Sequence, residues 1–175
     1  YVGTGWYERE FTVSDSLKGR RIAAVFCGVN YFSKIWVNGQ PAGEHEGSYE
    51  FSVDISKLVK FGQTNKITLE VMDPKETMDM EFPVGHQQAL GIRMGGIYRQ
   101  SWIEATGKTY VSDIHIIPDI DKSQAKVEVQ VNSPETDTTR PVRLDLLIEG
   151  PDGKRRTVRR RMVLPKSGKP FSATM

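Results

Sequence analysis

The side chains that most often carry catalysis or bind metals are sparse in this sequence. It holds three histidines and one cysteine, and no Ser, His and Asp residues stand in a context typical of a nucleophilic triad. His45, His86 and His115 are far apart and show no spacing of paired metal ligands. We therefore predict no catalytic residue, no metal site and no cofactor within these 175 residues.

Two other segments could in principle do chemistry. Cys27 follows the apolar run from Ile22 to Phe26, where a small buried hydrophobic residue is a more usual occupant than a reactive thiol. The glycine-rich segment 91–96 lacks the Lys-Ser/Thr pair of a phosphate-binding loop and does not precede a helix. We expect Cys27 to be structural and nucleotide binding to be absent.

One segment near the C-terminus is rich in positively charged residues. The formal net charge is only +2, but Lys154 to Arg161 contains six cations in eight residues. On a strand these cations divide between two faces, which argues against a single stripe for nucleic acid and favours a charged edge strand or contacts with acidic groups elsewhere. No apolar run approaches the ~20 residues of a membrane-spanning helix, so we expect no membrane span.

The elements that must position any site are strands. Apolar and polar residues alternate, as is typical of half-buried strands, in segments 7–13, 49–55, 67–71, 127–131 and 142–146. In the run from Ile22 to Val29 both odd- and even-numbered residues are apolar, which predicts a central strand covered on both sides. Asn38-Gly39 predicts a two-residue hairpin turn, and Asp152-Gly153 a second one.

Other segments interrupt the strands. Residues 54–60 could form one short capped helix, and residues 73–88, with no periodicity, are expected to form a long surface loop of functional interest. Aromatic residues such as Trp6, Trp36 and Trp102 could stack on a sugar ring, but we expect most of them to belong to the core.

A boundary near residues 107–110 divides the chain into a domain at 1–109 and a second one at 110–175. The second domain shows about four strand patterns, fewer than the ~7 strands of an immunoglobulin-like sandwich. We expect this domain to be incomplete, with strand edges that are less protected or that pair with another chain, and the whole chain to be a piece of a longer protein.

Five motifs in series carry a family resemblance. They are Gly5-Trp6-Tyr7-x-Arg9-x-Phe11, Phe26-x-Gly28-Val29-Asn30-Tyr31, Lys34-Ile35-Trp36-Val37-Asn38-Gly39, Gly43-Glu44-His45-Glu46-Gly47-Ser48-Tyr49 and Gly95-Gly96-Ile97-Tyr98-Arg99. In order and spacing they resemble the amino-terminal sugar-binding domain of glycoside hydrolase family 2. The resemblance implies an all-β fold: a jelly-roll, galactose-binding-like β-sandwich followed by a partial immunoglobulin-like sandwich.

The resemblance also implies a chemistry that lies elsewhere. Family members are retaining glycosidases whose two carboxyl groups sit on a later (β/α)₈ barrel of ~250 residues, which this strand-rich chain cannot contain. In β-galactosidases and β-glucuronidases an Asp seven residues before the Ile of the Gly-Gly-Ile-x-Arg motif reaches a sugar hydroxyl. Here that position is Leu90, so this chain departs from the pattern. The substitute candidates for the rim of the substrate site are His86, Gln87, Gln88 and Arg93.

We therefore expect a non-catalytic portion of a β-galactosidase-like enzyme for carbohydrate breakdown, which scaffolds the downstream barrel and shapes the substrate rim. Its expected partners are carbohydrate, through the parent enzyme, and that barrel, with no nucleic acid. The expected location is periplasmic or extracellular. A free-standing carbohydrate-binding module is the alternative.

Overall fold

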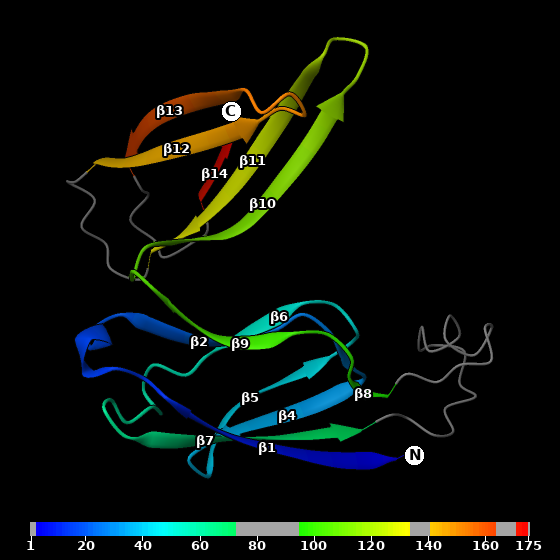
Figure 1. Ribbon diagram of the computed structural model, residues 1–175, viewed down its shortest axis with the longest axis vertical. Helices are drawn as coiled ribbons and strands as arrows, with labels where there is room; N and C mark the ends of the chain where they lie inside the picture. Colours follow the sequence, from blue (N-terminus) through cyan, green and yellow to red (C-terminus); the bar gives the residue numbers. More distant parts are fainter. Residues whose placement is uncertain (1–2, 73–94, 134–140, 164–170, 175) are drawn as a thin grey trace. The chain divides into compact units, whose positions relative to one another are not determined.

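The computed structural model describes residues 3–72, 95–133, 141–163 and 171–174. The chain divides into two compact units, unit 1 at Tyr1–Ala105 and unit 2 at Thr106–Met175. In the described residues nearly every element is a strand (Figure 1), so the all-β class predicted from the alternating pattern is confirmed. The assignment of domains to 1–109 and 110–175 stays a prediction.

Unit 1 holds strands β1 to β9. Their bounds are β1 Thr4–Thr12, β2 Arg21–Phe26, β3 Val29–Asn30, β4 Phe32–Val37, β5 Gln40–Glu46, β6 Phe51–Asp54, β7 Thr64–Met72, β8 Gly96–Ile97 and β9 Ser101–Thr106. One sheet has the order β1-β7-β4-β5, a second has the order β6-β2-β9, and β3 pairs with β8. A 3-10 turn at Asp15–Leu17, which the sequence pattern did not predict, connects β1 to β2.

The core of unit 1 lies between the two larger sheets. From the four-stranded sheet, Ile35, Ile67 and Leu69 are buried. They belong to one apolar cluster with Ile22 and Ala24 of β2, so the two sheets pack face to face. The predicted alternation along β7 is confirmed, because every second residue of that strand is buried.

The prediction of a central strand is also confirmed. β2 lies between β6 and β9, and all five residues from Ile22 to Phe26 are buried. A strand covered on both faces can bury consecutive apolar residues, which explains why the run lacks alternation. Cys27 lies just after this strand and is half-buried, whereas the sequence predicted a buried residue.

The Asn38-Gly39 hairpin is confirmed. Both residues have positive φ, 52° and 79°, and Val37 pairs with Gln40 across the turn. The Asn38 side chain donates to Asn65 Oδ1 at 2.8 Å. Asn65 is 1% exposed, and its Oδ1 also accepts from the Lys60 backbone N–H at 2.7 Å. The two amides therefore fix the hairpin to the loop before β7.

Two predictions for unit 1 are wrong. Residues 54–60 form turns and no helix, although Asp54 Oδ1 accepts from the Ser56 N–H at 2.9 Å as a cap would. The aromatic residues do not mostly belong to the core. Trp6 is 60% exposed, Trp102 43% and Tyr49 86%. Edge strands and outer sheet faces can carry aromatic residues in the same alternating pattern as inner faces, so the pattern does not distinguish them.

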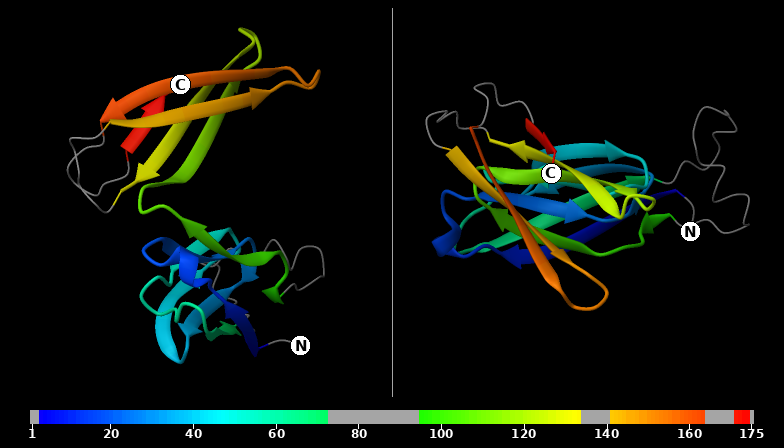
Figure 2. Two further views of the ribbon diagram at one scale, coloured as in Figure 1. Left: turned by 60° about the vertical axis from the view of Figure 1, so that its left-hand side comes forward. Right: turned by 90° about the horizontal axis from the view of Figure 1, so that it is seen from above.

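Unit 2 contains five described strands. They are β10 Tyr110–Asp119, β11 Gln124–Asn132, β12 Pro141–Glu149, β13 Arg155–Val163 and β14 Phe171–Thr174. One sheet has the order β10-β11-β14, and β12 pairs with β13 as a long hairpin (Figure 2). Val127, Val129 and Val131 form a small core against Leu144 and Leu146, which confirms both alternating segments.

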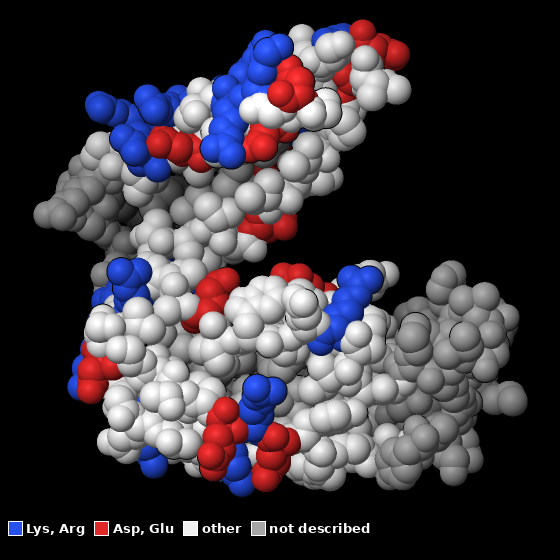
Figure 3. Space-filling model, in the orientation of Figure 1, with Lys and Arg blue, Asp and Glu red and all other residues white. Residues whose placement is uncertain are grey.

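The β12–β13 hairpin carries the cation run of the sequence. Its turn spans residues 150–154, longer than the predicted two-residue turn, with a positive φ at Gly153. Arg160 pairs across from the core residue Leu144, while Arg159 pairs across from Asp145 on the other face. The cations therefore divide between faces as expected, and Figure 3 shows blue Lys and Arg gathered over this hairpin with red carboxylates among them.

Within the described residues, no helix has the length and apolar character that crossing a membrane requires.

Candidate functional site

Segments of three motifs meet at one place in unit 1. β3 and β8 pair through Val29 with Ile97 and Asn30 with Gly96. Beyond β8, the Tyr98 N–H donates to the Gly28 carbonyl at 3.1 Å. The glycine-rich motif at residues 95–99 is therefore joined by backbone hydrogen bonds to the motif at residues 26–31.

Tyr98 closes this junction from a third direction. Its hydroxyl donates to the Ser48 carbonyl at 2.6 Å, and Ser48 Oγ donates to Asn30 Oδ1 at 3.2 Å. The ring lies over Gly28, where a Cβ would come within 2.7 Å of Tyr98 Cζ. A glycine is thus the residue that fits beneath this ring. We call Gly28, Asn30, Ser48, Gly96 and Tyr98 the motif cluster.

The motif cluster and the adjoining Tyr31 fix the points at which β7 ends and β8 begins. The Met72 carbonyl accepts from the Tyr31 N–H at 3.3 Å, and Gly96 pairs with the preceding residue, Asn30. Figure 1 shows the end of β7 and the start of β8 on the same side of unit 1. The chain thus leaves the sandwich and re-enters it beside two consecutive residues of one short segment.

The four rim candidates, His86, Gln87, Gln88 and Arg93, belong to the stretch between these two points. They lie outside the described residues, as do Leu90 and the expected loop at 73–88. Their assignment to the rim stays a prediction. The structure adds the motif cluster, whose residues belong to the motifs but have no role that the sequence alone predicts.

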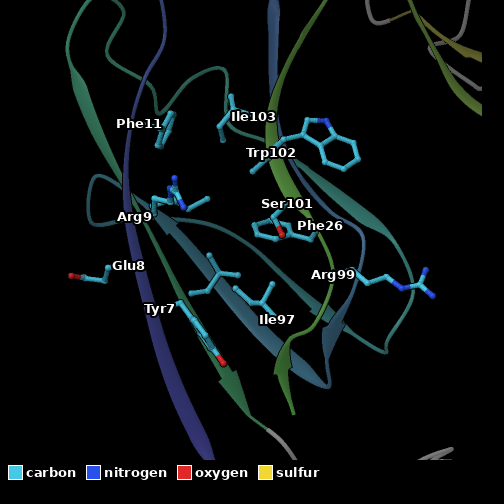
Figure 4. A pocket seen from close by; sticks show the side chains of 13 residues that line it. Tyr7, Glu8, Arg9, Phe11, Phe26, Ile97, Arg99, Ser101, Trp102 and Ile103 are labelled. Atoms are coloured by element: carbon cyan, nitrogen blue, oxygen red, sulfur yellow. The ribbon is translucent and has the colours of Figure 1, made fainter. Parts of the chain in front are cut away.

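A pocket of about 550 Å³ opens between the sheets of unit 1 (Figure 4). In Figure 4, Tyr7 and Arg9 point from β1 into the pocket, and Arg99 and Trp102 extend outward on the opposite side. The residues that line it are Tyr7, Glu8, Arg9, Phe11, Ala24, Phe26, Ile67, Leu69, Ile97, Arg99, Ser101, Trp102 and Ile103.

The chemistry of this pocket is that of an apolar cavity with cations near its mouth. Glu8 is the one residue with a carboxylate in its lining, but that carboxylate lies on the outer face of the sheet, where its Oε1 accepts from Lys66 Nζ at 2.9 Å and from Thr68 Oγ1 at 3.1 Å. These hydrogen bonds, led by that from Lys66, lower the pKa of Glu8. A carboxylate held ionised in this way is a poor general acid, and retaining hydrolysis needs a second carboxyl about 5 to 5.5 Å away.

Cys27 is not set up as a nucleophile. Its thiol donates to Glu50 Oε2 at 3.2 Å. Burial, and then this hydrogen bond and the charge of Glu50, raise the pKa of the Cys27 thiol above its ordinary value. Since the thiolate is the reactive form, this environment suppresses reactivity.

Two of the three histidines lie in described strands. His45 on β5 stacks on Phe51 with ring centroids 3.9 Å apart, and burial lowers its pKa. His115 on β10 occupies an ordinary exposed sheet position, with Nδ1 3.6 Å from Glu128 Oε2. Within the described ranges, no three His, Cys, Asp or Glu side chains are grouped as metal ligands would be.

Comparison with known proteins agrees with the motifs. Residues 1–106 match the family model described as "Glycosyl hydrolases family 2, sugar binding domain". The chain is 33% identical over 128 residues to a β-galactosidase of Thermoanaerobacter pseudethanolicus, which covers 73% of this chain and 17% of that protein. It is 29% identical over 153 residues to the β-glucuronidase of Felis catus, covering 75% and 24%.

Solved structures give the same picture for the fold. A glycosyl hydrolase family 2 member from Bacteroides cellulosilyticus superposes with a TM-score of 0.74 over 99% of this chain and 23% of that one, at 21% identity. At this identity the likeness concerns the fold alone. The chain spans less than a third of the length of each of these three proteins.

Proposed function

This chain belongs to glycoside hydrolase family 2, and from that premise we propose that it is the non-catalytic N-terminal portion of a retaining, β-galactosidase-like enzyme that breaks down carbohydrates. The observation that carries the proposal is the family match over residues 1–106, together with relatives that are β-galactosidases and β-glucuronidases. The sugar that the whole protein removes stays open between these two classes.

The chemical step is assigned to polypeptide outside these 175 residues. Retaining hydrolysis requires one carboxylic acid to protonate the leaving oxygen and a second carboxylate to attack the anomeric carbon. The family carries these groups on a (β/α)₈ barrel of ~250 residues. Glu8 is the one residue with a carboxylate in the lining of the described pocket, and Lys66 and Thr68 hold that carboxylate on the outer face of the sheet, which supports a scaffolding role for unit 1.

The second part of the proposal concerns the rim of the substrate site. His86, Gln87, Gln88 and Arg93 are proposed to take the place of the family's Asp, since Leu90 cannot accept a hydrogen bond from a sugar hydroxyl. The motif cluster supports this role because it fixes both attachment points of the stretch that contains them, Met72 and Gly96. A rim group that must meet a substrate needs such fixed attachment.

The test compares the 175-residue chain with the full-length protein on p-nitrophenyl β-galactoside and β-glucuronide. The full-length protein is expected to release nitrophenol from one of them and the chain from neither. Hydrolysis by the chain alone, or an inactive full-length protein, would contradict the proposal.

The rim assignment is tested separately in the full-length protein. Gln87→Ala and Arg93→Ala are expected to lower kcat/KM roughly tenfold, about 1.4 kcal/mol for one lost hydrogen bond to substrate. Lys18→Ala is the matched control, because Lys18 is exposed and ion-pairs only with Asp15 among the described residues. Unchanged kinetics in both variants would remove Gln87 and Arg93 from the substrate site.

A free-standing carbohydrate-binding module is not favoured, since the relatives named above are glycosidases several times longer than this chain. A periplasmic or extracellular location remains a prediction.

A further inference from the structure

The outer face of the four-stranded sheet carries a pair of tryptophans that neither the core nor the pocket uses. Trp6 on β1 and Trp36 on β4 stack across β7, with ring centroids 5.6 Å apart and planes at 28°. Trp6 is 60% exposed, while Trp36 is half-buried. Neither lines the pocket between the sheets. An exposed aromatic pair of this kind is a common feature of binding surfaces.

The strand register places polar groups directly beside the two rings. Trp6 lies opposite Glu70, which lies opposite Lys34. In the next row Glu8 lies opposite Thr68, which lies opposite Trp36. Residues that pair across a sheet point to the same face. We call these six residues the tryptophan face: Trp6, Glu8, Lys34, Trp36, Thr68 and Glu70.

Glu8 is already oriented on this face. Lys66 Nζ and Thr68 Oγ1 both donate to its Oε1, at 2.9 and 3.1 Å. Its Oε2 accepts no hydrogen bond from any residue that the structure describes and can accept one from a ligand. Figure 3 shows cations and carboxylates side by side over the middle of β1 and β7.

The charges decide between two kinds of ligand. The centres of protein interfaces are depleted of Lys and Glu, because burying an ionised group without a matched partner is costly. Here Glu8, Glu70 and Lys34 surround the rings, so a protein partner would have to desolvate them. A pyranose avoids this cost because its apolar face covers an aromatic ring while its hydroxyls, at the ring edge, reach neighbouring charged groups.

We propose that the tryptophan face binds a pyranose unit of a neutral oligosaccharide, with Trp6 stacking on the sugar ring and Glu8 accepting a hydrogen bond from a hydroxyl. Glu10 lies opposite Lys66 and Glu44 opposite Lys34 on this same face, so carboxylates outnumber lysines there, which disfavours an anionic sugar and favours a neutral one. Binding at this face does not depend on the hydrolytic function proposed above.

The experiment uses the ¹⁵N-labelled chain and two neutral probes, cellotetraose and a β-linked galactotetraose. The three tryptophans give three indole N–H resonances. Those of Trp6 and Trp36 are expected to shift on titration with at least one probe, with a Kd on the order of 1 mM, while that of Trp102 stays in place. A shift confined to Trp102, or no shift with sugar at roughly ten times that concentration, would overturn the proposal.

Variants test the roles of the two named groups. Trp6→Ala is expected to weaken binding by about tenfold and Glu8→Gln by a few-fold. Trp102→Ala is the matched control, since it removes an exposed tryptophan elsewhere in unit 1. Trp6→Phe keeps an aromatic ring and should retain most of the affinity, which separates loss of stacking from loss of folding.

The titration is then repeated on the full-length protein. Equal affinity for the tetrasaccharide in the chain and in the full-length protein supports an accessory sugar-binding surface. Binding by the chain but not by the full-length protein would show that other parts of the polypeptide cover this face, and would overturn the proposal.

Discussion

The contact between Gly28 and Tyr98 gives a prediction with a magnitude that the structure defines. In Gly28→Ala, the new methyl group would lie 2.7 Å from Cζ, 2.9 Å from Cε2 and 3.0 Å from Oη of Tyr98. Real Cβ atoms do not come this close, so the ring must move. Tyr98 is 37% exposed and can swing outward, but its hydroxyl then loses the 2.6 Å hydrogen bond to the Ser48 carbonyl.

The expected cost follows from these two effects. Overpacking costs about 1 to 3 kcal/mol and a lost neutral hydrogen bond about 1 kcal/mol. Replacing glycine by alanine returns about 0.4 to 1 kcal/mol through the unfolded state. We expect Gly28→Ala to lower the free energy of unfolding of unit 1 by roughly 2 kcal/mol. In a Tyr98→Ala background the same substitution meets no ring, so it should cost nothing or stabilise slightly.

Urea unfolding followed by tryptophan fluorescence measures this difference. Trp6, Trp36 and Trp102 all lie in unit 1, so the signal reports that unit and not unit 2. A change of 2 kcal/mol moves the midpoint by roughly 1 M urea. A coupling energy near zero in the double-mutant cycle, with Gly28→Ala equally costly in both backgrounds, would refute the reasoning that the ring is what requires glycine.

Four further substitutions test the sandwich, and each is checked by the same urea titration. Ile35→Ala leaves a cavity at a side chain that is 1% exposed and should cost about 2 to 5 kcal/mol; a cost below about 1 kcal/mol would contradict the assigned core. Asn65→Ala removes four hydrogen bonds around a buried amide, including those with Lys60, and should cost about 2 to 4 kcal/mol, more than Asn38→Ala, which removes three hydrogen bonds of a less buried amide. Because burial lowers the pKa of His45 in the folded state, the unfolded chain takes up its proton first, so unit 1 should lose stability as pH falls below about 6.5. His45→Phe should reduce that loss, and an identical pH profile for the variant would show that another group causes it.

The sequence predicts strands well where one face of a sheet is buried. β7 buries every second residue, β11 does so from Val127 on, and the unbroken apolar run at β2 lies at the centre of its sheet. The Asn38-Gly39 turn is equally clear, because few residue pairs accept positive φ at both positions. In these places local pattern and tertiary packing impose the same requirement.

The same pattern misleads where alternation exists without burial. Tyr7 and Tyr49 fit a period of two but are exposed, because which face of a strand is covered depends on a partner sheet that the local sequence does not specify. The motif cluster is harder to predict from the sequence than the strands are. Tyr98, Ser48 and Gly28 are joined by contacts between residues up to 70 positions apart, which spacing along the chain cannot reveal.

The attachment of Met72 and Gly96 to the neighbouring residues Tyr31 and Asn30 bears on how such enzymes can diversify. When both anchors of an insertion are fixed by the scaffold, doubling the number of residues between them costs only ~0.6 kcal/mol in closure entropy. Insertions, deletions and wholesale replacement between these anchors would therefore leave the sandwich intact. One scaffold could in this way accept new substrate-contacting sequences over evolution, and a designer could graft such sequences at the same two anchors.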